Sequence, residues 1–358
     1  MNKIIALLFF NLFLLGSSLN AANLYLVDNG NTTGTNLMWE SQIPSGFTNI
    51  YKVNLSSCNG GSSASLTQWL TDRNKTTAPS YTVSQVVGSS GNVTFTTSDQ
   101  VWITAGTYSV STTWTILSGS GAVVPAGIYG GFAGNETTLS GRIKGAIGNP
   151  WDYSNETIVD GGMTCSTGFT TAISARTILY DGLTLNGFIT TVAIYLRDGG
   201  TVQNCKFTNN GNGTYAGGGS VSTYGSAATT TTVSGCYFYY NVSSTKCPGL
   251  NVNANTGTGT YNISNCWFEN NNSSRAGADG SALFVSRATG TATVTVSNCI
   301  FKNNTASYYR GGTIVLNNEY ASIKNCLIYG TTTTPALFFN TNGGSIYNCT
   351  FVNNTGGG

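Results

Sequence analysis

The sequence predicts an all-β protein that folds as a right-handed parallel β-helix with an N-terminal capping segment. Two observations carry this prediction: one short motif recurs six times in the second half of the chain, and apolar residues alternate within each copy. The copies begin at Asn204, Gly235, Asn265, Asn298, Asn325 and Asn348, and most read Asn-Cys-x-Phe-x-Asn-Asn. Their cysteines lie 31, 30, 33, 27 and 23 residues apart, a period typical of stacked-repeat proteins.

The alternation of Cys and Phe at every second position indicates a strand in each copy. A second alternating run precedes each of the later copies, as in Thr293–Val296, and a third apolar stretch, such as Ser281–Val285, lies between copies. We find no copy with the apolar stripe of an amphipathic helix. Three short strands and three bends per repeat describe one coil of a parallel β-helix, and successive coils stack about 4.8 Å apart.

Stacked coils place the same motif position in vertical columns of like side chains. We expect an interior column of thiols, at Cys205, Cys236, Cys266, Cys299, Cys326 and Cys349. A second interior column is expected at Phe207, Phe238, Phe268, Phe301, Ile328 and Phe351. A column of asparagines is expected at the bend, where the side-chain amides of Asn209, Asn270, Asn303 and Asn353 would hydrogen-bond to one another. Asparagine also tolerates the left-handed backbone conformation that such a bend requires.

The chain is predicted to have three parts. Residues 1–22 resemble a secretory signal, with Lys3 before an apolar run that is too short for a comfortable membrane span. Residues 23–100 lack the motif and form the predicted N-terminal cap, with one short helix at Ser65–Asn74. The β-helix is expected over 101–358. Because the last motif is followed by only a few residues, its coil would present an open edge, and we expect the natural protein to continue.

Composition excludes several functions. Charged residues make up only 8% of the chain, and the net charge of +2 argues against a nucleic-acid partner. The absence of histidine removes the commonest acid–base group and transition-metal ligand. We therefore predict neither a cofactor nor a metal site.

Nine cysteines in an exported chain raise the question of disulfides. Stacked cysteines have parallel Cα–Cβ bonds, and their Cβ atoms stay near the ~4.8 Å strand spacing, beyond the ~3.8 Å typical of a disulfide. The sequence therefore predicts a column of reduced, buried thiols. It gives no pairing for Cys58, Cys165 and Cys247, which lie outside the column.

Two kinds of functional site are candidates. Polysaccharide cleavage needs a positioned acid and base, and Asp160, Asp181 and Asp198 are each followed by glycine on successive early coils. Asp-Gly is also a turn signal, which is the interpretation that we favour. Glu269 and Lys302 share one column on adjacent coils and are predicted to form a surface ion pair of little energetic weight.

The other candidate is a binding surface. Tyr237 and Trp267 flank inward residues and should face outward, with Tyr239 and Tyr329 in a neighbouring column. An exposed aromatic strip suits sugars or a partner surface, unless long loops cover the rings.

Three segments resemble a family of secreted bacterial β-helix proteins. Val101–Tyr108 resembles their IWVAAGTY stretch, Gly127–Thr137 their LYGGFAGTET segment, and Thr157–Gly161 the ILDGN that follows. The Asn-Cys-x-Phe-x-Asn-Asn coils resemble polymorphic outer-membrane-protein-like and adhesin-like repeats. The resemblance covers about residues 100–358. It implies export to the surface or exterior of a Gram-negative bacterium, often with a C-terminal sorting domain, and it implies no single activity.

Together these observations predict a secreted or cell-surface protein, a non-enzymatic adhesin-like stalk or passenger that contacts a polysaccharide or a partner surface. The alternative is a carbohydrate-active enzyme, a lyase or hydrolase on a pectate-lyase-like β-helix. Three or more acids on one exposed sheet would favour the enzyme, whereas an aromatic face without acids would favour binding.

Overall fold

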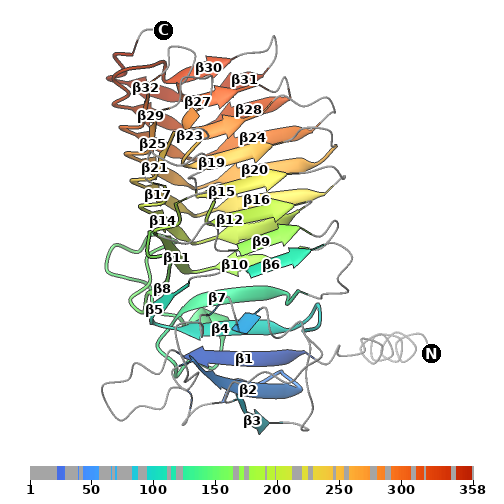
Figure 1. The fold of residues 1–358 in the computed structure, drawn as a ribbon. Helices are drawn as coiled ribbons and strands as arrows, with labels where there is room; N and C mark the ends of the chain where they lie inside the picture. Colours follow the sequence, from blue (N-terminus) through green and yellow to red (C-terminus); the bar gives the residue numbers. More distant parts are fainter. Residues whose placement is uncertain are drawn as a thin grey trace, which may run out of the picture.

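The computed structural model is a tall stack of short strands that runs from the N-terminal end at the bottom to the C-terminal end at the top (Figure 1). The structure describes residues 22–28, 39, 43–55, 66, 69–70, 83–87, 95–110, 114–117, 124–163, 169–172, 177–189, 192–197, 199–211, 220–224, 229–244, 247–253, 258–274, 280–286, 292–307, 312–317, 320–339 and 344–356. In these residues the strands form three long sheets, named A, B and C here, and one small sheet.

Sheet A has twelve strands. In spatial order they are β3 (Val83–Val87), β2 (Asn49–Asn54), β1 (Asn23–Asp28), β4 (Gln100–Thr104), β7 (Gly127–Phe132), β10 (Leu179–Asp181), β13 (Gly200–Gln203), β16 (Thr230–Ser234), β20 (Thr260–Ser264), β24 (Thr293–Ser297), β28 (Ala321–Lys324) and β31 (Ser345–Tyr347).

Sheets B and C run alongside sheet A. From the C-terminal end, sheet B contains β32 (Thr350–Val352), β29 (Leu327–Tyr329), β25 (Ile300–Lys302), β21 (Trp267–Glu269), β17 (Tyr237–Tyr239), β14 (Lys206–Thr208), β11 (Leu183–Asn186), β8 (Thr157–Asp160) and β5 (Gly106–Ser109). Sheet C contains β30 (Leu337–Phe339), β27 (Gly312–Leu316), β23 (Gly280–Val285), β19 (Leu250–Asn253), β15 (Val221–Tyr224), β12 (Ile194–Arg197), β9 (Phe169–Ala172) and β6 (Trp114–Leu117). The small sheet contains β18 (Val242–Ser243), β22 (Asn272–Ser273) and β26 (Thr305–Ala306).

From β4 onward the chain visits sheets A, B and C in turn, and each strand pairs in parallel with its equivalent one coil later. This is the predicted parallel β-helix, and the fold class is confirmed. Strand β21 shows the expected alternation, because Phe268 is fully buried while Trp267 and Glu269 on either side are partly exposed.

The N-terminal segment continues sheet A below the regular coils. Strands β2 and β1 are parallel to each other and to β4, whereas β3 is antiparallel to β2. The Tyr25 ring packs on Tyr51, Trp69 and Phe95 at centroid distances of 5.2, 5.9 and 5.2 Å. Within the predicted short helix, Trp69 is helical and buried, as are its neighbours Leu66 and Leu70. The core of the solenoid therefore extends into the N-terminal segment as an aromatic cluster.

The aromatic column fills the interior. Phe207, Phe238, Phe268 and Phe301 stack with their ring planes within 9° of parallel, at successive centroid distances of 4.9, 4.5 and 4.8 Å. These distances match the spacing between parallel strands, so the register of sheet B sets the ring spacing. Ile328 continues the column and is buried. Phe351 holds the same register position on β32, the end strand of sheet B, and is 44% exposed.

The thiol column is present as well. Its six cysteines are free, and all are buried except Cys349, which is partly exposed. Burial raises the pKa of the Cys236 and Cys299 thiols, which favours the protonated form of these two side chains. Cys247 is also free and buried, whereas Cys58 and Cys165 lie outside the described residues.

The predicted asparagine column is wrong by one residue. Asn209, Asn270, Asn303 and Asn353 take left-handed φ angles of 51–56°, as expected for the bend, but in the described part of the chain their side chains are not buried and do not bond to one another; Asn209 donates to Asn186 instead. The buried column consists of the next residue in each coil, Asn210, Asn241, Asn271 and Asn304, each 0% exposed. The left-handed residue shifts the alternation by one position, and the second asparagine therefore points inward.

This buried column satisfies its own polar atoms. Nδ2 of Asn241 donates to Oδ1 of Asn271 at 2.9 Å, and Asn271 donates in the same way to Asn304. Each Nδ2 also donates to a backbone carbonyl one coil below, as Asn271 does to Phe238. Because unpaired buried amides are costly, this continuous bonding stabilises the bend in every coil.

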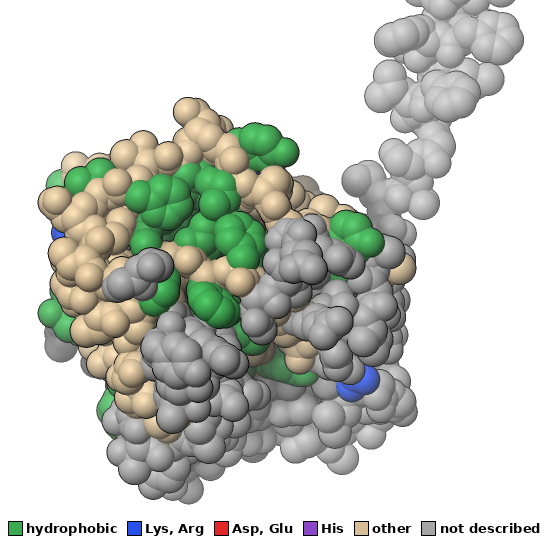
Figure 2. Space-filling view, turned by 90° about the horizontal axis from the view of Figure 1, so that it is seen from above, with side chains coloured by type: hydrophobic (Ala, Val, Ile, Leu, Met, Phe, Trp, Pro, Cys, Tyr) green, Lys and Arg blue, Asp and Glu red, His purple; other side chains and the backbone are tan. Residues whose placement is uncertain are grey.

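The C-terminal end of the stack carries exposed apolar side chains (Figure 2). They include Ile346, Tyr347, Phe351 and Val352. Within the part of the chain that the structure describes, no helix has the length and apolar character of a membrane span.

Candidate functional site

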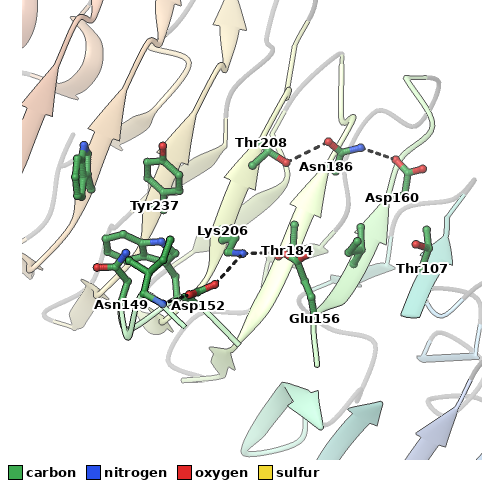
Figure 3. Close-up of a pocket in the computed structure, with 14 residues that line it drawn as sticks. Thr107, Asn149, Asp152, Glu156, Asp160, Thr184, Asn186, Lys206, Thr208 and Tyr237 are labelled. Carbon is green, nitrogen blue, oxygen red and sulfur yellow. Dashed lines mark hydrogen bonds and ion pairs between the residues drawn. The ribbon is translucent and has the colours of Figure 1, made fainter. Parts of the chain in front are cut away.

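A cleft of about 730 Å³ lies over the outer face of sheet B. Its floor comes from strands β5, β8, β11, β14, β17 and β21, and one wall comes from residues 133–156, the β7–β8 loop (Figure 3). This loop includes a short 3₁₀ turn, Leu139–Gly141. The cleft combines aromatic rings at one end with carboxylate, amide and ammonium groups along the floor.

Arg142 anchors the β7–β8 loop to the solenoid. Its guanidinium pairs with the Asp181 carboxylate at 2.9 Å and donates to the carbonyls of Gly130 and Leu139, both at 3.0 Å. The two charged side chains are 8% and 4% exposed. A buried pair with this many hydrogen bonds fixes the base of the loop in one position.

The rest of the loop is held by its own contacts. Nζ of Lys144 lies 3.5 Å from the centre of the Tyr153 ring and donates to the carbonyl of Pro150. Burial, aided by the nearby Arg142 charge, lowers the pKa of Lys144 to about 8. The Glu136 carboxylate accepts three backbone N–H groups at 2.6–3.1 Å. These contacts give the loop a defined shape over sheet B.

The loop places Trp151 against the aromatic residues of the sheet. The Trp151 ring stacks on Tyr237 at 5.3 Å with an interplanar angle of 22°, and it meets Trp267 edge-on at 6.2 Å. Tyr237 and Trp267, from adjacent strands, are 6.1 Å apart. The predicted aromatic strip is thus partly covered by a loop, but the covering residue is itself aromatic and extends the surface into a wall.

The other two predicted aromatic residues lie beyond the cleft lining. Tyr239 stacks on Tyr237 at 5.3 Å, and Tyr329 is in register with Lys302 on the next strand of sheet B. The predicted Glu269–Lys302 pair is present at 2.8 Å. The Tyr237 hydroxyl donates to Glu269 at 2.8 Å, and burial together with this hydrogen bond raises the pKa of Tyr237. Glu269 therefore orients a ring of the aromatic wall.

The floor of the cleft is organised around Lys206. Its Nζ lies 3.0 Å from Oε1 of Glu156 and 3.7 Å from Oδ1 of Asp152. The Thr184 hydroxyl donates to the same Glu156 oxygen at 2.6 Å. One ammonium is thus shared by two carboxylates, both from the β7–β8 loop, with Glu156 directly before β8 (Figure 3).

A second row of polar groups crosses three adjacent strands beside this cluster. Thr208 donates to Oδ1 of Asn186 at 3.1 Å, and Nδ2 of Asn186 donates to Oδ1 of Asp160 at 3.0 Å (Figure 3). Asp160 also accepts the backbone N–H of Gly162 at 3.0 Å. The row presents hydroxyl, amide and carboxylate groups to the cleft at the strand spacing.

The structure does not bring the three predicted catalytic aspartates together. Asp160 lines the cleft, whereas Asp181 is buried in sheet A, where it pairs with Arg142 and accepts hydrogen bonds from Gln203 and Asn204. Asp198 lies outside the described residues. Gly182 has φ +72°, so this Asp-Gly pair marks a bend as well as an anchor.

The sequence analysis missed Trp151, Asp152, Glu156 and Lys206. The signal that could have found them is a departure from the repeat at Gly235, where the other five copies have asparagine. A Cβ atom built at Gly235 would lie 2.9 Å from Cβ of Pro150, in the β7–β8 loop. The missing side chain therefore marks where the loop packs on the coils.

Replacing Gly235 by asparagine, the residue of the other copies, is expected to displace the β7–β8 loop. Asparagine tolerates the local φ of +58°, so the backbone of the coil should hold while the new side chain meets Pro150. Overpacking of this kind costs about 1–3 kcal/mol. Trypsin cleavage after Arg142 and Lys144 should then accelerate roughly tenfold, since cleavage follows the population of the open form.

The matched control is Asn265→Gly, the reverse exchange at the same motif position one coil later. This variant should leave the cleavage rate of the loop unchanged. Equal cleavage rates for Gly235→Asn and the unmodified protein would contradict the packing of the loop on Gly235.

Within the described residues, no group of three or more cysteine, aspartate or glutamate side chains is placed to hold a metal ion. Comparisons of the chain with protein-family models, with curated proteins and with solved structures gave no match. Functional inference therefore rests on the chemistry of the cleft.

Proposed function

We propose that this protein is an adhesin-like β-helix, displayed on the surface of a bacterial cell or secreted, that binds glycan chains in the cleft over sheet B. The observation that supports this most is the pairing of an aromatic wall, Trp151, Tyr237 and Trp267, with a floor of polar groups. Ligand sites are typically concave, with apolar walls and a few placed polar groups.

Sugar rings present both kinds of surface. Their C–H faces pack on aromatic rings, and their hydroxyl groups both donate and accept hydrogen bonds. In the cleft, Asn186 and Thr208 supply neutral polar groups, and Asp160 and Glu156 supply strong acceptors. The arrangement follows the strands of a rigid solenoid, so little conformational entropy is lost when a ligand binds.

The three carboxylates of the cleft are also the feature that favours the alternative, a carbohydrate-active enzyme. Asp152 and Glu156 both lie close to one ammonium, and a hydrolase needs two carboxylates flanking the bond that it cleaves. Yet both share the Lys206 ammonium, and Oδ1 of Asp160 accepts from Asn186 and Gly162. Such bonded carboxylates suit fixed recognition better than proton transfer, and we favour binding.

Binding should be measured on an immobilised panel of neutral, amino-bearing and acidic polysaccharides. Trp151→Ala is expected to weaken binding about tenfold, because it removes one ring of the wall and its stacking contact with Tyr237. Tyr347→Ala serves as the control, since Tyr347 is an exposed aromatic residue, 60% accessible, that is not part of the cleft lining. Equal binding by Trp151→Ala and the unmodified protein would show that the cleft is not the glycan-binding site.

The same panel tests the alternative, that the protein is a carbohydrate-active enzyme. Each polysaccharide should be incubated with the protein, with and without calcium, and scored for new reducing ends and unsaturated products. Turnover that disappears in Glu156→Gln would replace the binding proposal with a catalytic one.

A further inference from the structure

We propose that the cleft selects glycans that carry free amino groups, such as polymers of glucosamine, and discriminates against acidic glycans. This inference rests on the proposed function and names the ligand class of the same site. Three observations support it: the charges along the floor of the cleft, the hydrogen-bond partners that these charged groups already have, and the carboxylate oxygens that accept no hydrogen bond among the described residues.

The floor carries an excess of negative charge. Three carboxylates, Asp152, Glu156 and Asp160, and one ammonium, Lys206, line the cleft, so the net formal charge is −2. A uronate or sulfate group entering the cleft would face like charges at short range. The wall of Trp151, Tyr237 and Trp267 keeps water from one side, which strengthens this repulsion relative to open solvent.

Lys206 does not offset this repulsion. Its ammonium already pairs with Glu156 at 3.0 Å and lies 3.7 Å from Asp152, and its side chain is only 20% exposed. A ligand carboxylate would have to displace one of these two partners. The lysine therefore acts as an internal counter-ion that holds the two acids in place.

Acceptor atoms remain for a cationic ligand. Among the residues that the structure describes, Oε1 of Glu156 takes the hydrogen bonds from Lys206 and Thr184, and Oδ1 of Asp160 takes those from Asn186 and Gly162. Oε2 of Glu156 and Oδ2 of Asp160 have no such partner there. The Glu156 side chain is 37% exposed, so it is accessible to a ligand. An ammonium group carries three donors, and its bonds to carboxylates are about twice as strong as neutral ones.

The preference must come from the cleft and not from the protein as a whole. The chain has a net charge of +2, which would weakly repel a cationic polymer at long range. Selection of an amino glycan is therefore a specific consequence of the local carboxylates.

The test compares glucosamine oligosaccharides with the N-acetylated oligosaccharides of the same length, at a pH at which the free amines are protonated. The pair differs only at the amino nitrogen, which is a charged ammonium in one form and a neutral acetamide in the other, and an oligouronate of equal length is the acidic member. We expect the free-amine form to bind roughly tenfold more tightly than the acetylated form, the gain typical of one charge-assisted hydrogen bond, and the oligouronate to bind most weakly. The ratio should fall when ionic strength is raised.

The variant Glu156→Gln/Asp160→Asn keeps the shape of both side chains and removes both charges. Its ratio of affinities for the free-amine and acetylated forms should approach one, while binding of the acetylated form persists. Asp28→Asn, which removes a charge from β1 in sheet A, should keep the full ratio. Circular dichroism of each variant checks that the fold is intact, and Glu156→Gln alone should give an intermediate ratio.

Three results are informative. A preference for the free-amine form that is lost in the double variant supports the inference. Equal affinity for the two forms, or tighter binding of the oligouronate, overturns the inference and leaves the proposed function standing. If no oligosaccharide binds, the proposed function itself is contradicted.

Discussion

Replacing Phe268 by alanine is expected to lower the free energy of unfolding by about 3–5 kcal/mol. Phe268 is fully buried, and its ring stacks between Phe238 at 4.5 Å and Phe301 at 4.8 Å. Truncation removes its apolar area from the interior and leaves a cavity that the hydrogen-bonded coils above and below cannot close, because strand pairing fixes their spacing. Urea denaturation followed by circular dichroism measures the loss.

The control for this variant is Asn262→Ala, in the same coil. Asn262 occupies an outward position on β20, between the buried residues Tyr261 and Ile263. Its replacement should change the free energy of unfolding by no more than about 0.5 kcal/mol. A loss of that small size for Phe268→Ala would mean that the ring is not part of the interior column.

The positions of the strands and of the two apolar columns could be predicted because they depend on a period of two. Within each motif, Cys and Phe are separated by one residue, and parallel stacking fixes the vertical neighbours once the repeat is aligned. Phe268 therefore could be placed between Phe238 and Phe301 from the spacing of the motifs alone.

The asparagine column could not be placed by the same rule. Strict alternation from Cys205 and Phe207 puts Asn209 inward, but this residue adopts a left-handed φ of 52°. Such a residue reverses the direction of the next side chain, so Asn210 is the buried one. Two consecutive asparagines look alike in the sequence, and only the backbone angles tell which one turns the chain.

The cleft could not be predicted from the repeat, because the loop that forms its wall lies outside the repeat. The β7–β8 loop lies before the first regular motif, and its docking on β17 joins residues that are far apart in the sequence, Trp151 and Tyr237. Of the cleft residues, the repeat supplied Tyr237 and Trp267, and the Asp-Gly pattern supplied Asp160. Lys206 lies in a motif position that varies freely between copies, so nothing in the repeat distinguished it.

The second large effect is expected for Arg142→Met, which leaves the Asp181 carboxylate buried without its counter-ion. Removing one partner of a buried ion pair typically costs about 3–5 kcal/mol. Asp181 keeps its hydrogen bonds from Gln203 and Asn204, which places the expected loss near the lower end of that range. Thermal denaturation and urea titration both measure it. The same change releases the β7–β8 loop from the carbonyl of Gly130, so glycan binding should weaken as well.

The double variant Arg142→Met/Asp181→Leu separates the two consequences. Without either charge, no unpaired ion remains in the interior, and well-packed apolar replacements of buried pairs are often neutral in stability. We therefore expect the double variant to regain most of the stability lost in Arg142→Met, while the loop, now without its ion-pair anchor, still binds glycans more weakly than in the unmodified protein. If Asp181 instead acts on a substrate, the double variant would be stable and would have lost a measurable turnover. A double variant that is no more stable than Arg142→Met would contradict the role of Asp181 as the counter-ion of the anchor.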